Sequence, residues 1–139
     1  MKDFIANIYE LGGLCYFGDF SKYMYKADLY GEVTLLTILI PLVVFFIYYK
    51  PLDHIRLAKT GIWATLLLAV SLITSMAAEH LAEAGIEDYL VQHQIQRTTI
   101  STVDSFWFSI IVFLYAAILS FVFSIVFKVG SSRSRRIPF

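Results

Sequence analysis

Long apolar runs alternate with short polar stretches along this chain. Three runs contain no Asp, Glu, Lys, Arg or His: 33–49, 61–78 and 105–127. A helix rises about 1.5 Å per residue and needs about 20 residues to cross a hydrocarbon core of about 30 Å. The first two runs reach that length with their flanks, and the third exceeds it. The pattern predicts an all-α integral membrane protein with three transmembrane helices, at about 33–49, 61–82 and 105–128.

Helix-breaking residues indicate where these helices bend and end. Pro51 disfavours helical geometry at the residue before it, so the first span should end there. Pro41 lies inside the same span and is expected to kink it. We expect the second helix to continue to about residue 84 and the chain to turn at Gly85. Asp104 or the serine after it is a suitable cap for the third helix.

The segment before the first span predicts two short amphipathic helices. Phe4, Ile8 and Leu11 recur at helical spacing before two glycines interrupt, and Asp19 is placed to cap a second helix. We expect both helices to lie at the membrane interface, against the bilayer or a neighbour. The chain then divides into an interfacial segment, a transmembrane domain and a basic tail: 1–30, 31–129 (with an outer acidic connection at 79–104) and 130–139.

Composition agrees with a membrane protein. The chain is 58% hydrophobic and only 16% charged, whereas soluble domains carry about 25% charged residues. Cys15 is the only cysteine, which excludes an intrachain disulfide and a cysteine-built zinc site.

The charges predict an orientation, although the formal net charge is zero. Basic residues concentrate on one side of the membrane: Lys50, Arg56, Lys59, Lys128, Arg133, Arg135 and Arg136. The other side carries Lys2, Lys22, Lys26 and Arg97 among many acids. Because basic loops stay in the cytoplasm, we expect the N-terminus outside and the C-terminus inside, with a bacterial inner membrane favoured.

An acidic cluster follows the second span. It comprises Glu79, His80, Glu83, Glu87 and Asp88. If the helix continues, the three glutamates form one stripe at i, i+4 and i+8. The cluster is open to three interpretations: the solvated end of a helix, an outer mouth or partner surface that attracts cations, or a metal site. We predict no metal, because His80 and Glu83 supply only two of the ligands that zinc needs.

The spans contain no ionisable residue at depth, which argues against a pump or carrier. Ser71, Thr74 and Ser75 have no base nearer than His80, so a serine nucleophile is not expected. We therefore predict no enzyme activity. We also predict no bound cofactor, since His80 is the one histidine near a span where haem would lie.

Small residues recur on two of the spans. Ala116, Ser120 and Ser124 are spaced by four on the third span, and the second span carries a comparable stripe of Ala64, Ser71, Ser75 and Ala78. Such stripes allow helices to approach closely. They predict either packing between the two helices of one subunit or contact with a sister subunit or partner.

The tail carries Arg133, Arg135 and Arg136 just past the third span. Arginines here set topology and can hold anionic lipid headgroups. A nucleic-acid partner is not expected, because that role needs a larger basic surface with interleaved aromatics.

Three functional hypotheses follow. The favoured one is a non-catalytic membrane subunit that self-assembles or anchors a larger complex, with the lipid bilayer, further copies of the chain or other subunits as partners. The second is an oligomeric cation pore, since three spans with a basic inner tail resemble the layout of three-span phage holins. The third is a haem or quinone anchor, since His80, Asp88 and Tyr89 resemble residues of the small membrane anchors of succinate dehydrogenases.

Overall fold

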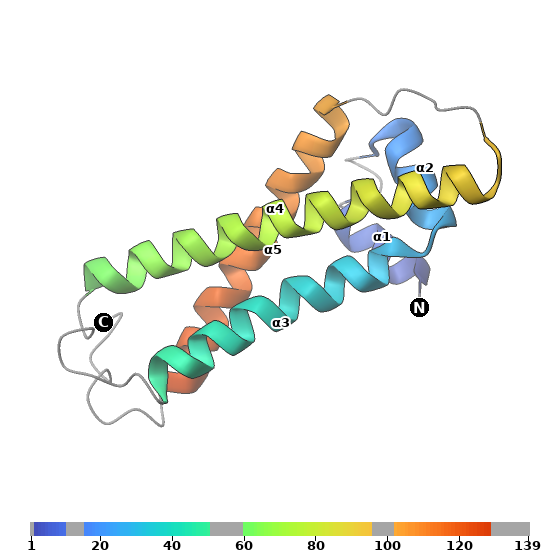
Figure 1. Cartoon of the computed structure of the whole chain (residues 1–139). Coiled ribbons are helices and arrows are strands. Elements are labelled where there is room, and N and C mark those ends of the chain that lie inside the picture. The colour runs from blue at the N-terminus through green and yellow to red at the C-terminus, as the bar shows by residue number, and fades with distance from the viewer. Residues whose placement is uncertain (1, 11–15, 51–59, 96–101, 129–139) are drawn as a thin grey trace.

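A computed structural model of the chain describes residues 2–10, 16–50, 60–95 and 102–128. These residues form helices, with no strand among them. The helices are α1 (Lys2–Tyr9), α2 (Gly18–Lys26), α3 (Leu29–Tyr49), α4 (Thr60–Gln92) and α5 (Thr102–Lys128) (Figure 1). The last three are long and apolar enough to cross a membrane. The predicted fold class is therefore confirmed.

The three long helices pack against one another, and the two short ones join them at one end. Figure 1 shows α3 and α4 running alongside each other, with α5 crossing them. At the end that holds α1 and α2, all five helices contribute to one apolar core. We call this end the head. Its core includes Tyr9 of α1, Met24 of α2, Val33 of α3, Ile86 of α4 and Phe108 of α5.

α2 turns its apolar face onto the chain's own bundle, whereas α1 is buried through Ala6 and Tyr9 and not through the predicted Phe4–Ile8 face. Tyr9, Phe20 and Met24 are buried there. The expected contact with a neighbour is thus supplied by α3, α4 and α5 themselves. Part of α1 still faces outward, since 69% of Phe4 is exposed and Ile8 is also accessible.

A second, aromatic core holds the opposite end of the bundle. Phe45, Tyr48 and Tyr49 are buried at the end of α3. Side chains of the other two spans pack against them: Trp63, Leu66, Leu67, Phe123 and Phe127. The bundle is therefore fixed at both ends by ring packing, which adds about 0.5–1.5 kcal/mol per favourable ring pair beyond the area buried.

Some helix ends match the sequence pattern and others do not. α3 ends at Tyr49, as the following Lys-Pro pair predicts, and it runs through a buried Pro41. The expected caps are wrong. α2 is preceded by Phe17, whose backbone N–H donates to Ser21 Oγ at 3.1 Å, so Asp19 lies in the first turn. α5 begins at Thr102, which also places Asp104 inside its first turn. In the first turn of each helix, the negative carboxylate interacts favourably with the positive end of the helix dipole.

The predicted turn at Gly85 is also wrong, because α4 continues through it to Gln92. The reason is tertiary. A Cβ atom at Gly85 would lie 2.5 and 2.8 Å from the two methyl carbons of Leu29, at the start of α3. Gly85 therefore allows α3 to approach α4 closely. The glycine that suggested a turn is required for this packing instead.

The extra turns make α4 long for a membrane helix. Its 33 residues span about 50 Å at about 1.5 Å per residue, against a hydrocarbon core of about 30 Å. The excess forms part of the head, where Ala82, Ile86 and Leu90 are buried.

Gly85→Ala should lower the stability of the bundle. Overpacking against Leu29 costs about 1–3 kcal/mol, whereas alanine gains roughly 1 kcal/mol of helix propensity, so we expect a net loss of about 1 kcal/mol. Thermal unfolding in detergent, followed by circular dichroism, measures this change.

Two further variants give this measurement its controls. Gly31→Ala places a Cβ where nothing lies within 4 Å, so it should be neutral or stabilising. In a Leu29→Ala background, Gly85→Ala should change sign and become stabilising. Equal effects at Gly31 and Gly85 would contradict the role assigned to close approach.

Candidate functional site

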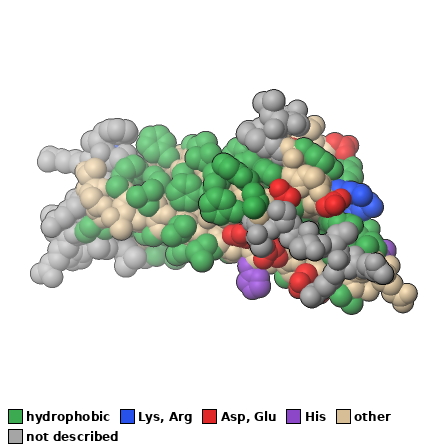
Figure 2. Space-filling view, turned by 90° about the horizontal axis from the view of Figure 1, so that it is seen from above, with side chains coloured by type: hydrophobic (Ala, Val, Ile, Leu, Met, Phe, Trp, Pro, Cys, Tyr) green, Lys and Arg blue, Asp and Glu red, His purple; other side chains and the backbone are tan. Residues whose placement is uncertain are grey.

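The acidic cluster lies on one continuous helix. Because α4 extends to Gln92, Glu79, Glu83 and Glu87 do share one face of it, at i, i+4 and i+8. His80, Glu87 and Asp88 are exposed, and the other two members are half-buried. We call these five residues the acidic surface. Figure 2 shows acidic side chains and a histidine grouped at one end of the molecule, next to the apolar surface of the spans.

The acidic surface has no geometry for a metal ion. No three His, Cys, Asp or Glu side chains within the described ranges are placed to hold one. His93 lies 13 positions beyond His80, which is about 20 Å along a helix. Its ring stacks on Tyr89 with 4.1 Å between centroids, and its Nδ1 lies 2.9 Å from the Tyr89 carbonyl oxygen. The two histidines are therefore too far apart to bind the same metal ion.

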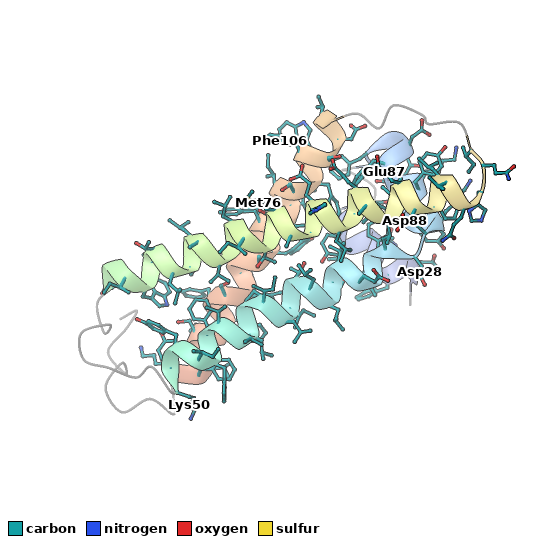
Figure 3. The ribbon with its side chains drawn as sticks, viewed as in Figure 1. Asp28, Lys50, Met76, Glu87, Asp88 and Phe106 are labelled. Carbon is teal, nitrogen blue, oxygen red and sulfur yellow. The ribbon has the colours of Figure 1, made fainter. Side chains whose placement is uncertain are left out.

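The two ends of the bundle differ in charge. All acidic residues that the structure describes belong to the head or to the part of α4 leading into it: Asp3, Glu10, Asp19, Asp28, Glu32, Glu79, Glu83, Glu87, Asp88 and Asp104. In Figure 3, Asp28, Glu87 and Asp88 lie towards this end, whereas Lys50 lies at the opposite one. The basic residues of the head whose side chains the structure describes are Lys22 and Lys26. The head is therefore strongly acidic.

Hydrogen bonds fix α1 to the head. The Tyr115 hydroxyl of α5 donates to the backbone carbonyl of Ile8 at 2.6 Å. The Tyr30 hydroxyl of α3 donates to the Glu10 carboxylate at 2.8 Å. The ring of Tyr9 packs between these two tyrosines, with centroids 6.1 and 5.5 Å away. α1 is thus attached to two different spans.

A third bond joins α1 to α2. The Tyr25 hydroxyl donates to the Asp3 carboxylate at 2.5 Å. This bond raises the pKa of Tyr25 above its ordinary value of 10.0, since the carboxylate stabilises the protonated phenol. The contribution of the bond to stability is present below pH 10 and is lost as the pH rises through the elevated pKa.

Most small residues of the two predicted stripes are covered by the chain itself. Ser71, Ser75, Ala116, Ser120 and Ser124 are each at most 3% exposed. They lie between spans of one subunit, and only Ala64, which is half-buried, lies partly on the outer surface. The Ser71 hydroxyl donates to a backbone carbonyl of its own helix, as does that of Ser75. The Ser120 hydroxyl has no hydrogen-bond partner within the described residues.

Ser124 also forms hydrogen bonds with side chains of the two other spans. The indole N–H of Trp63 on α4 donates to its Oγ at 2.7 Å, and the hydroxyl of Tyr49 on α3 shares a hydrogen bond with the same atom at 2.8 Å. One hydroxyl therefore joins all three spans. Sequence reasoning missed Tyr49 and Trp63. The available signal was that each is an aromatic residue with a polar group near the end of a span.

The predicted lipid-binding tail lies outside the described residues, so Arg133, Arg135 and Arg136 have no structural account. Comparisons of the chain with protein-family models, with curated proteins and with solved structures found no match. The geometry and charge of the described helices therefore carry the functional argument.

Ser124→Ala should destabilise the bundle by about 1–3 kcal/mol, since it removes the hydrogen-bond partner of the Trp63 indole N–H and the bond with the Tyr49 hydroxyl. The matched control is Ser120→Ala on the same helix, which removes an equally buried hydroxyl without a partner. The control should be neutral or slightly stabilising. Thermal unfolding in detergent compares the two, and equal losses would mean that the three-way bond contributes nothing.

Proposed function

We propose that the chain is a non-catalytic membrane subunit that self-assembles or anchors a larger complex. The observation that carries this proposal is the covered interior of the bundle. The hydroxyls of Ser71, Thr74 and Ser75 are buried, and each is bonded to its own helix. The chain's distinctive chemistry therefore lies on its outer surfaces, where other proteins and lipids make contact.

The spans offer wide surfaces for lateral contact. Only 28% of the most apolar window of each span is buried within the chain. Large apolar side chains face outward on all three, among them Leu35 on α3, Met76 on α4 and Ile118 on α5. Lipid covers such surfaces in an isolated subunit, and neighbouring helices cover part of them in a complex.

The head supplies a second kind of contact. The acidic surface stands on a helix whose adjacent face is packed against α2 and α3, so its charges are held in a fixed arrangement. A fixed negative surface favours a partner that carries Lys or Arg and speeds the encounter between the two. This supports Glu79, His80, Glu83, Glu87 and Asp88 as the docking face of the proposed subunit.

The same charge asymmetry supports the proposed orientation. Acids collect at the head, and the basic residues of the sequence collect beyond the other ends of the spans. By the positive-inside rule the head lies outside and the C-terminus in the cytoplasm. We propose the bacterial inner membrane as the location.

The pore remains the second proposal, supported by the acids at one end of the spans, which would attract cations. The burial of Ser71 and Ser75 limits the form of such a pore, because a path lined by these hydroxyls requires a rearrangement of α4 that exposes them. A path between several copies would instead be lined by the outward apolar side chains.

The mass of the native particle tests the proposal. We expect the protein extracted from its own membranes in mild detergent to run as a stoichiometric assembly, with a mass above that of one chain after correction for detergent. Glu79→Gln with Glu83→Gln should shrink this assembly. The matched control, Asp19→Asn with Glu32→Gln, removes two charges elsewhere on the head and should leave it intact.

Other outcomes redirect the proposal. A colourless monomer that carries no partner contradicts both self-assembly and anchoring. Cation flux into liposomes that falls in the Glu79/Glu83 variant favours the pore. A visible absorption band that disappears on His80→Ala favours the haem anchor.

A further inference from the structure

A groove opens beside α1, between this helix and two of the spans. It has a volume of about 200 Å³. Ile5 and Ile8 of α1 form one wall, Ile38 of α3 a second, and Ile118 and Leu119 of α5 a third. An apolar cavity of about 150 Å³ holds a benzene molecule. The groove therefore has room for a short stretch of hydrocarbon chain.

The hydroxyls that line the groove are already used as donors. Tyr9 donates to Thr37 at 3.4 Å, and Thr37 in turn donates to the carbonyl of Val33 at 2.7 Å. The hydroxyl of Thr34 donates to the carbonyl of its own helix four residues earlier, also at 2.7 Å.

The fourth hydroxyl, on Tyr115, donates to the Ile8 carbonyl. The groove thus offers no uncommitted hydroxyl donor to a polar ligand. A quinone carbonyl or a peptide backbone would lose its hydrogen bonds to water there without replacement, at a cost of about 1–3 kcal/mol per group. A hydrocarbon chain has no such cost.

The mouth of the groove is continuous with the outward surface of the spans. Ile38 is 40% exposed and Ile118 is 59% exposed, and both lie on helices apolar enough to cross the membrane. Next to the mouth, Ile8 and Phe4 of α1 also face outward. Because lipid tails surround these surfaces in a bilayer, the groove opens directly onto hydrocarbon.

From this arrangement we propose that the groove binds one acyl chain of a membrane phospholipid. The lipid comes from the leaflet on the head side, and its tail lies between α1 and the α3–α5 pair. It covers the exposed sides of Ile8, Ile38 and Ile118. This proposal is independent of which protein partner the subunit binds.

Native mass spectrometry of the protein, released from mild detergent, tests the proposal. We expect wild type to retain one mass increment per chain, equal to that of a phospholipid. Ile118→Trp fills the mouth and should abolish the increment. Ile125→Trp, on the same helix at a similarly outward position that does not line the groove, should keep it.

A second pair of variants tests whether the loss of lipid in Ile118→Trp results from a folding defect. Ile38→Trp should also lose the increment, and Leu35→Trp on the same helix should keep it. Circular dichroism must show all four variants folded at the temperature of measurement. Delipidated wild type should regain one phospholipid from mixed micelles in a saturable manner.

Three results would overturn the proposal. One is a wild type that carries no increment and takes up none. Another is retention by folded Ile118→Trp and Ile38→Trp at the level of their controls. The third is an increment with the mass of a free fatty acid, which would show that the ligand is not a phospholipid.

Discussion

Hydrocarbon leaves no water for a buried polar group, and this constraint organises the whole bundle. A hydroxyl placed among the spans is stabilised by a partner inside the protein, and Ser120 is an exception among the described residues. Threonines and serines of α3 and α4 bond to carbonyls of their own helices. Ser124 instead connects three helices through one oxygen atom. The polar side chains of the spans thus form hydrogen bonds inside the bundle. The outer surface consists of apolar side chains on the spans and charged side chains on the head.

Packing in the head also stabilises the bundle, beyond the ends of the spans. α4 is long enough to leave the membrane; α2 and α3 pack against it, and α1 reaches the same core through α3 and α5. Leu29 lies close to Gly85 in this packing, so a larger residue at position 85 would require the Leu29 side chain to shift. The acidic surface is therefore carried by a folded unit. Such rigidity supports the proposed docking role, because a surface that is already ordered loses little conformational entropy on binding.

The spans could be predicted because an apolar run long enough to cross a bilayer, with no charge inside it, rarely occurs outside membrane proteins. The two short helices could also be predicted from their spacing. The Gly85 turn was predicted wrongly because glycine permits both a turn and a close approach, and the choice depended on Leu29, which is distant in sequence. The roles of Trp63 and Tyr115 were hidden for the same reason, since their partners lie 61 and 107 positions away. The acidic surface was visible in the sequence, and only its continuous helical support came from the fold.

The bond between Tyr115 and Ile8 also sets an order of events during biosynthesis. α1 precedes the spans along the chain, yet the Tyr115 hydroxyl that donates to its Ile8 carbonyl lies in the middle of α5. The native contacts of α1 are therefore incomplete until α5 has been inserted. Before that point, α1 can form only the bonds that join it to α2 and α3. A segment made early is in this way among the last to complete its native contacts.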